Sequence, residues 1–211
     1  MSVSLSKGGH VSLSKEAPGV TAVRVALGWD VRTTTGADYD LDASALLCGK
    51  SGRAPSHAHF VFDNDPTSPD GSVEHAGDNR TGGDGPGDDE AIAVDFTRMA
   101  AEVDQTVFTV NSFTGATFDE VENPYCRLVD ESTEAGLARY TLSGGGHHTA
   151  QIMAKFSRIK GSWQLTAIGE PAWGPPSKTS CPPSTTTSDP SVPARRSTGW
   201  SRPVGGGDTT A

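Results

Sequence analysis

The chain has 211 residues and carries 26 acidic against 17 basic side chains, a formal net charge of −9. This acidic balance argues against a nucleic-acid partner, because phosphate binding needs clustered Lys and Arg. No stretch approaches the roughly 18 apolar residues of a membrane helix, and the opening "MSVSLSKGGHVSLSKE" lacks the apolar core of a secretory signal. We therefore expect a cytoplasmic protein that does not insert into a membrane.

Short β-rich runs, separated by Gly, Pro, Asn and Asp clusters, fill most of residues 1–173. In the first run, "TAVRVAL", Val23, Val25 and Leu27 share one face and Arg24 lies on the other. Further runs are "HFVF", "TVFTVNSF", "YCRLV" and "LARYT". Two later runs alternate as well, and their predicted apolar faces are Ile152, Ala154 and Phe156, with Lys155 opposite, and Trp163, Leu165 and Ala167. The pattern predicts a mainly β domain, a sandwich or barrel of antiparallel sheets.

Two further segments differ from this pattern. Residues 95–103, "DFTRMAAEV", begin with an acidic residue and continue with helix formers, so we predict a short helix there. From residue 174 to residue 211 the chain is dense in Pro, Ser, Thr and Gly and has hardly any apolar periodicity. Such a segment cannot offset its ordering entropy by burial, so we predict a disordered tail. Its composition also resembles an out-of-frame translation.

Acidic side chains cluster in three stretches. In "GADYDLDASA", Asp38, Asp40 and Asp42 would lie on one face of a strand, where they repel unless a hard cation neutralises them. The Pro-rich "FDNDPTSPDG" adds Asn64 and Asp70. Residues 77–90, "GDNRTGGDGPGDDE", contain five carboxylates and a single basic residue, Arg80. The carboxylates of this last stretch are Asp78, Asp84, Asp88, Asp89 and Glu90.

Calcium is the cation that suits these stretches. It takes six to eight oxygen ligands, and Gly-rich loops let backbone carbonyls turn toward an ion. A phosphate-binding loop is disfavoured, because five carboxylates would repel phosphate. The EF-hand pattern fails as well, since Ala43 stands where Gly is required and Gly49 where Glu closes the loop. From composition alone, the alternative is that the acidic loop is simply solvated and binds no metal.

Two classes of function are compatible with the acidic stretches. One is a calcium-dependent binding module without catalysis. The other is a metal-assisted hydrolase, which needs a base beside the metal. His75, in "VEHAGDN", is the candidate base nearest to the acidic residues. Because the stretches otherwise offer only carboxylates, glycines and amides, we favour the binding module.

Several motifs in order are similar to one known family. The runs "LGWDVR", "DYDLDASA", "HFVF", "GDNRTG", "GDDEAI" and "AIGEPA" resemble the TerD family of bacterial tellurium-resistance and stress-response proteins, over residues 2–173. The resemblance implies a β-sandwich of two sheets in residues 1–173 that binds calcium through acidic loops. It also implies a cytoplasmic stress system with other tellurium-resistance proteins, including membrane-bound ones, as partners.

The resemblance also implies a set of calcium residues. By motif these are Asp40, Asp42, Asp78, Asn79, Asp88, Asp89 and Glu90. The charge argument adds Asp30, Asp38, Asn64, Asp70 and Asp84. After "AIGEPAW" the chain departs from the family, because its Pro-rich tail stands where a short apolar closing segment is expected.

Overall fold

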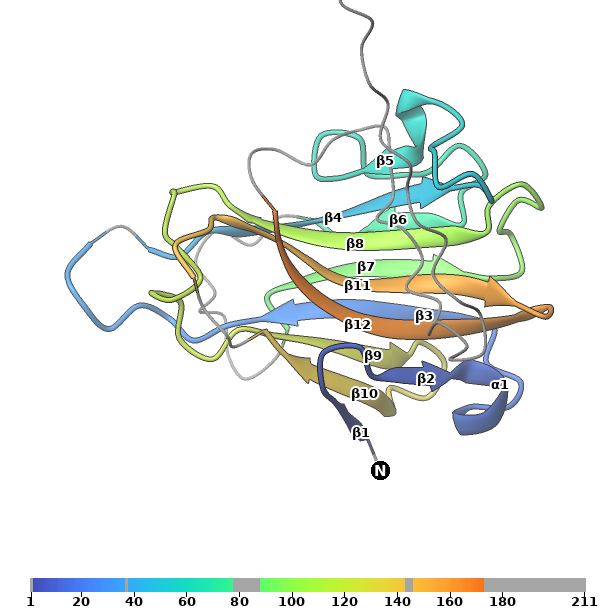
Figure 1. Ribbon diagram of the computed structural model, residues 1–211, viewed down its shortest axis with the longest axis horizontal. Coiled ribbons are helices and arrows are strands. Elements are labelled where there is room, and N and C mark those ends of the chain that lie inside the picture. Colours follow the sequence, from blue (N-terminus) through green and yellow to red (C-terminus); the bar gives the residue numbers. More distant parts are fainter. Residues whose placement is uncertain (1, 37, 78–87, 143–145, 173–211) are drawn as a thin grey trace, which may run out of the picture.

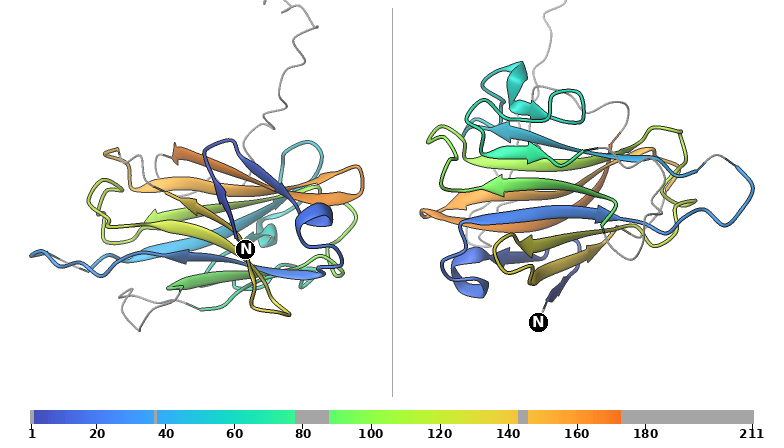
Figure 2. Two further views of the ribbon diagram at one scale, coloured as in Figure 1. Left: turned by 90° about the horizontal axis from the view of Figure 1, so that it is seen from below. Right: turned by 180° about the vertical axis from the view of Figure 1, so that it is seen from behind.

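The computed structural model describes residues 2–36, 38–77, 88–142 and 146–172. Within these ranges the chain forms two six-stranded sheets that pack face to face, which confirms the predicted β-sandwich (Figures 1 and 2). Sheet A has the strand order β1-β10-β9-β3-β7-β6 and sheet B the order β2-β12-β11-β8-β4-β5. The strands are β1 Val3–Leu5, β2 His10–Ser12, β3 Ala22–Gly28, β4 Leu41–Cys48, β5 Phe60–Val61, β6 Val73–His75, β7 Glu90–Asp95, β8 Gln105–Ser112, β9 Tyr125–Asp130, β10 Gly136–Thr141, β11 Ala150–Ile159 and β12 Ser162–Ala172.

The N-terminal segment contributes to both sheets. Strand β1 pairs with β10, and this is the one parallel pair among the described strands. Strand β2 follows directly and pairs antiparallel with β12 in the other sheet. The first two strands therefore cover one edge of the sandwich, where the two sheets come together (Figure 1).

The core between the sheets follows the predicted alternation. Val23, Val25 and Leu27 of β3 point inward and are almost fully buried. From sheet B, the rings of Phe108 and Phe156 pack edge to face, with centroids 5.7 Å apart. Such aromatic pairs contribute about 0.5–1.5 kcal/mol beyond the apolar area they bury. The alternation in the sequence thus identified the inner face of β3 correctly.

The prediction for β11 was wrong at one position. The pairing of β11 with both neighbours shifts between Ile152 and Ala154, as a β-bulge does. Because the bulge turns Met153 into the core next to Ala154, Ile152 packs on the other face against a second apolar cluster. A period-two pattern cannot anticipate such a shift, since the bulge moves every residue before it to the opposite face.

The helix predicted for residues 95–103 is absent from the structure, which gives turns there instead. Asp95 is the last residue of β7, and its carboxylate accepts hydrogen bonds from the backbone N–H and the hydroxyl of Thr97. This local turn competes with a helix, and nine residues are too few for a stable helix without packing. The next residue, Phe96, stacks on Trp163 instead.

The helices of the described residues are short: α1 spans Leu13–Glu16 and the 3-10 helix η1 spans His57–His59. Neither these nor any other described helix has the length and apolar character needed to span a membrane. The predicted tail, residues 174–211, lies outside the described residues, so the domain boundary stays a prediction.

Candidate functional site

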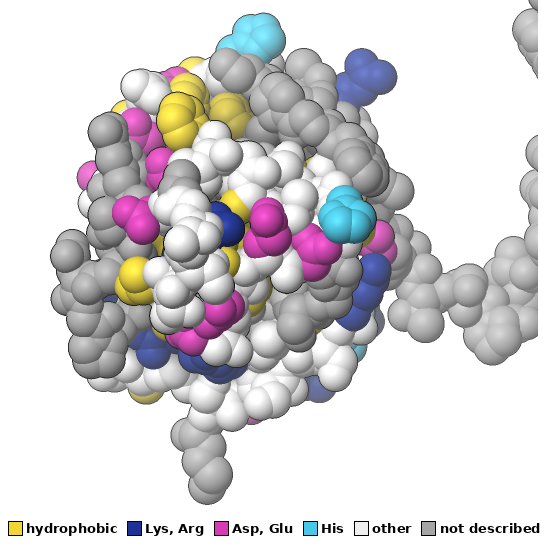
Figure 3. Space-filling model, turned by 90° about the vertical axis from the view of Figure 1, so that its left-hand side faces the viewer, with side chains coloured by type: hydrophobic (Ala, Val, Ile, Leu, Met, Phe, Trp, Pro, Cys, Tyr) yellow, Lys and Arg dark blue, Asp and Glu magenta, His cyan; other side chains and the backbone are white. Residues whose placement is uncertain are grey.

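Several strands begin or end at one end of the sandwich, the left-hand end in Figure 1. Strand β3 ends there at Gly28 and β6 ends at His75, while β4 begins at Leu41 and β7 begins at Glu90. The register agrees, because Leu27 pairs with Glu90 and His75 pairs with Ile92. Asp and Glu side chains are visible on this end of the molecule (Figure 3). We call it the acidic end.

Glu90 connects the two sheets at the acidic end. Its side chain leaves β7 of sheet A, is almost fully buried, and accepts a hydrogen bond from the backbone N–H of Ala43 in sheet B at 2.5 Å. Strand β5 pairs only with Ala45 and Leu46 of β4, so it ends before it reaches Ala43. The Glu90 carboxylate takes the place of a strand partner, and it fixes the backbone next to Asp42.

His75 lies beside Glu90 in the interior. Its Nδ1 accepts a hydrogen bond from the Gly77 N–H at 3.1 Å, and its Nε2 lies 3.8 Å from Glu90 Oε2. Burial disfavours the charged ring and lowers the pKa of His75, but the Glu90 carboxylate outweighs it, so the pKa lies above its ordinary value. Both side chains are only 1% exposed.

The two aspartates before Glu90 are held by different groups. Asp89 accepts a hydrogen bond from the Trp29 N–H at 2.9 Å, just after the end of β3. Asp88 forms a bidentate ion pair with Arg127 of β9, with N···O distances of 2.5 and 2.7 Å. That hydrogen-bonded pair raises the pKa of the Arg127 guanidinium. Asp88 is therefore already neutralised by a cation that belongs to the protein.

The predicted row of Asp38, Asp40 and Asp42 is only partly a strand. Strand β4 begins at Leu41, so Asp42 alone lies within it, opposite Asn111 of β8. Asp40 is half-buried just before the strand, and its backbone carbonyl accepts a hydrogen bond from the Phe113 N–H. Asp38 is exposed. Leu41 and Ala43 point into the core, so the Asp42 side chain between them lies on the outer face of β4, while Glu90 reaches the neighbouring Ala43 N–H from inside.

Asp30 and Asn64 lie on the surface. Asp30 follows β3 at the acidic end, and its carboxylate accepts a hydrogen bond from the Asn123 side chain. Asn64 is exposed in the turn formed by residues 62–65, and two residues later the Pro66 carbonyl accepts the N–H of His75. Neither side chain contacts the buried Glu90 carboxylate through a described hydrogen bond.

Asp70 belongs to another part of the molecule. Its carboxylate accepts hydrogen bonds from Ser68, from Ser72 and from the Ala100 N–H. Partial burial opposes its charge, but these donors outweigh burial and lower its pKa to about 2. Because Ser72 bonds to Asp95, Asp70 lies near the end of β7, the length of the strand away from Glu90. The structure therefore gives Asp70 a structural role and separates it from the other predicted ligands.

Asp78, Asn79 and Asp84 lie outside the described residues. In the part of the chain that the structure does describe, no three His, Cys, Asp or Glu side chains lie close enough together to hold a metal ion. Sequence analysis missed Arg127 as a partner of the acidic stretch. Alternation in "YCRLV" does place it on an outer face, but only the pairing of β9 with β3 brings it to Asp88.

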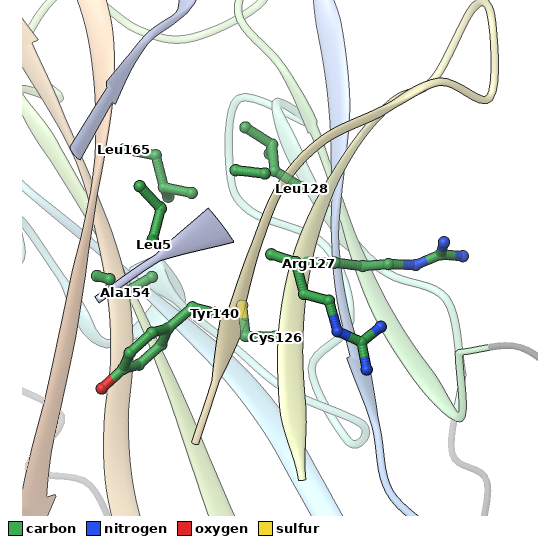
Figure 4. Close-up of a pocket in the computed structure, with 10 residues that line it drawn as sticks. Leu5, Cys126, Arg127, Leu128, Tyr140, Ala154 and Leu165 are labelled. Carbon is green, nitrogen blue, oxygen red and sulfur yellow. The ribbon is translucent and has the colours of Figure 1, made fainter. Parts of the chain in front are cut away.

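An apolar cavity lies between the sheets near β1 (Figure 4). It is lined by Leu5, Leu128 and Leu165 among others, and the Arg127 side chain points away from it. Burial raises the pKa of the adjacent Cys126 thiol to about 12, so this thiol is not a reactive thiolate. A lining without convergent polar groups marks a packing defect rather than a binding site.

Comparisons with known proteins agree with the fold and with the motifs. The TerD domain family model matches residues 1–174. Tellurium resistance protein TerD of Serratia marcescens is 43% identical over 175 residues, which cover 81% of this chain and 91% of that protein. General stress protein 16U of Bacillus subtilis (strain 168) is 38% identical over 175 residues, covering 80% of this chain and 90% of that protein.

A solved structure supports the same conclusion for the fold. The crystal structure of a homologue of telluride resistance protein (TerD) from Streptomyces coelicolor A3(2) superposes with a TM-score of 0.60. It covers 75% of this chain and 94% of that chain at 23% identity. The family match over most of the chain and the identity to curated relatives lead to one assignment. This chain belongs to the TerD family of tellurium-resistance and stress proteins.

Proposed function

We propose that this chain is a calcium-binding, non-catalytic module of a bacterial tellurium-resistance and stress-response system. One observation carries the proposal: the hydrogen bond from Ala43 to Glu90 brings two separate acidic stretches together. Residues 40–42 and 88–90 meet at the same end of the sandwich as a result. Like charges that converge there repel, and a bound divalent cation would offset that repulsion.

The oxygen donors at the acidic end fit calcium. Calcium prefers carboxylate and carbonyl oxygens, and its loose geometry suits ligands that come from several loops. Asp40, Asp42 and Asp89 are the candidate ligands among the described residues, and Asp89 is oriented by its hydrogen bond from Trp29. Such outer contacts of a ligand tune metal affinity. Since no three described acidic side chains lie close enough together for a metal ion, the site needs further ligands. The sequence adds Asp78, Asn79 and Asp84 as further candidates from outside the described residues.

The burial of His75 supports a module without catalysis. In the alternative reading, a metal-assisted hydrolase, His75 serves as the base that activates water. A base must come within hydrogen-bond reach of the proton it removes. The side chain of His75 is 1% exposed, and its Nδ1 is occupied by the Gly77 N–H. The proposal also includes a cytoplasmic location, with other tellurium-resistance proteins, membrane-bound ones included, as partners.

Calorimetric titration of the full chain with calcium tests the binding. We expect saturable binding at least about tenfold tighter than that of magnesium, which demands a near-ideal octahedron. Asp42→Asn should weaken it clearly. Glu74→Gln, at an exposed position of β6, is the matched control and should leave it unchanged. Equal affinities for the two ions, or no uptake of calcium, would contradict the proposal.

A turnover assay tests the alternative. The full chain, with calcium or magnesium, is offered phosphoester and glycoside substrates, and we expect no turnover above background. Activity that His75→Ala abolishes would show that the hydrolase reading is right.

A further inference from the structure

Part of the outer face of sheet B is buried, although the outer face of a sandwich normally meets solvent. Ala45 and Leu47 of β4 point into the core, so Leu46 between them points outward. Directly paired neighbours extend this position into one row across four strands: Phe60, Leu46, Val107 and Lys155. All four are at most 6% exposed. We call them the buried row.

Lys155 is an unusual member of the buried row. Its neighbours in sequence, Ala154 and Phe156, point into the core, so its own side chain lies on the outer face of β11. Burial lowers the pKa of its amine. Lys155 makes no hydrogen bond or ion pair with a described residue. Because a lysine is almost never fully buried unless it is paired, some segment must lie over it.

The described segments account for one end of the buried row. Ala54 packs against the apolar cluster that contains Phe60, and η1 lies beside β4. Lys155 stands three strands from β5 in the order β5-β4-β8-β11, which is about 14 Å across the sheet. The other described helix, α1, lies beside β12. The two described helices therefore do not explain the burial of Lys155.

The cysteines indicate which segment covers this face. Cys48 belongs to the same outer cluster, is completely buried and is disulfide-bonded. Cys126 lies in the core between the sheets and is free. The chain has three cysteines, so Cys181 is the one left to pair with Cys48. Cys181 belongs to residues 173–211, which follow β12 of sheet B.

This segment is long enough to cross the face. Ala172, the last residue of β12, and Cys48 lie level with opposite ends of β8, about 20 Å apart along the strands. Three strand spacings from β12 to β4 add about 14 Å across the sheet, so the diagonal is about 25 Å. Residues 173–181 span up to about 30 Å when extended. The diagonal crosses β11 and β8, the strands of Lys155 and Val107.

We propose that residues 173–181 cross the outer face of sheet B, cover Lys155 and are tied to Cys48 by a disulfide of Cys181. The composition of this segment predicts no core of its own, so its apolar contacts must be made with the sandwich. The inference does not depend on calcium.

The tie depends on the redox state of the surroundings. To form the disulfide, the two thiols lose two protons and two electrons. Oxidised glutathione accepts them as it is cleaved to two molecules of reduced glutathione. Because a reducing compartment keeps thiols reduced, the covered face opens there and closes under oxidising stress.

The experiment treats the full chain with oxidised or reduced glutathione. Peptide mapping without reduction identifies the disulfides by mass spectrometry, and the rate of acetylation measures the access of solvent to the Lys155 amine. Lys160, an exposed residue just after β11, is the internal control. Cys48→Ala removes one half of the bond, and Cys126→Ala is the matched control variant.

In the oxidised chain we expect a disulfide between Cys48 and Cys181 of the same molecule, in the wild type and in Cys126→Ala. Lys155 should be acetylated about tenfold more slowly than Lys160, because a covered amine reacts only while the segment is open. Reduced glutathione or Cys48→Ala should speed up the acetylation of Lys155 and leave that of Lys160 unchanged.

Four results overturn the proposal. The mapping finds no bond between Cys48 and Cys181, or Lys155 reacts as fast as Lys160 in the oxidised chain. Equal protection of Lys155 in Cys48→Ala and in the oxidised wild type would show that the bond does not close the face. Disulfides between two molecules, with protection that depends on protein concentration, would show that a second copy covers it. If Cys48→Ala does not fold, Cys181→Ala carries the same test from the other half of the bond.

Discussion

At the scale of single residues, neighbouring carboxylates make different contacts. Glu90 accepts a backbone N–H across the two sheets, Asp89 accepts the Trp29 N–H, and Asp88 pairs with Arg127. Asp70 receives its hydrogen bonds from a serine-rich turn at the far end of β7. What a carboxylate does here depends on which donors the fold brings to it.

Asp70 makes stability depend on pH in the acid range. Its folded pKa of about 2 lies below the ordinary 3.8, so its stabilisation is complete above 3.8 and is lost as pH falls toward 2. Asp70→Asn should melt at a lower temperature than the wild type near neutral pH. The difference should shrink between pH 4 and pH 2, as thermal melts in chelator across that range will show. A difference that stays constant down to pH 2 would contradict this account, and Glu102→Gln, at an exposed position, is the control.

Glu90 should matter for stability even without calcium. Glu90→Ala leaves the buried N–H of Ala43 without its acceptor, which costs about 1–3 kcal/mol. Urea denaturation in chelator measures the loss. Glu74→Ala removes an exposed carboxylate from the neighbouring strand and should change stability by no more than about 0.5 kcal/mol. If both variants unfold at the same urea concentration, the link between the sheets has no energetic importance.

At the scale of elements, the bulge in β11 is matched by a glycine in β12. Pairing shifts between Ile152 and Ala154 on one strand and between Glu170 and Ala167 on the other. Gly169 lies in that interval with φ +62°, and a Cβ built on it would lie 1.9 Å from the Tyr140 hydroxyl oxygen. Both the backbone and the neighbouring ring therefore require glycine.

Gly169→Ala should destabilise the domain by about 1–2 kcal/mol from backbone strain alone. The collision with Tyr140 should add to this. The double variant with Tyr140→Phe lacks the hydroxyl, so we expect it to be less destabilised than the sum of the two single variants. Denaturant curves for the four proteins give the coupling, and strict additivity would show that the hydroxyl contact is unimportant.

Sequence patterns predicted features that depend only on the residues of one strand. The alternation of β3 gave its buried face, because period-two polarity follows directly from strand geometry. It failed at Ile152, although Gly169 in "AIGEPA" was a sign of a bulge in the partner strand. The helix at residues 95–103 failed because the Asp95 side chain forms a turn.

The sequence predicted which acidic stretches are present, but it did not predict which of their side chains lie together in the fold. Counting charges found the acidic stretches, and strand geometry suggested a shared face. Neither could separate Asp70 from Asp89, because the two lie at opposite ends of one hairpin of strands that sequence alone does not align. The partnership of Asp88 with Arg127 likewise depends on β9 lying beside β3, a long-range pairing.

At the scale of the whole molecule, calcium should act as a stabiliser. A ligand that binds only the folded state adds about 2.7 kcal/mol at a hundredfold excess over its dissociation constant. The melting temperature of the full chain should therefore rise with calcium relative to chelator, and more than with magnesium at equal concentration. Identical melting temperatures in calcium and chelator would show that the acidic end is only a solvated surface.

The position of the first two strands has a consequence for biosynthesis. Strand β1 pairs with β10 and β2 pairs with β12, so these two strands find their partners only after most of the other described strands have been translated. Until β10 and β12 have been made, Val3–Leu5 and His10–Ser12 have no sheet to join. Folding of this sandwich therefore cannot proceed in step with translation from the N-terminus. The edges of β10 and β12 also stay open to pairing with other nascent chains until β1 and β2 pair with them.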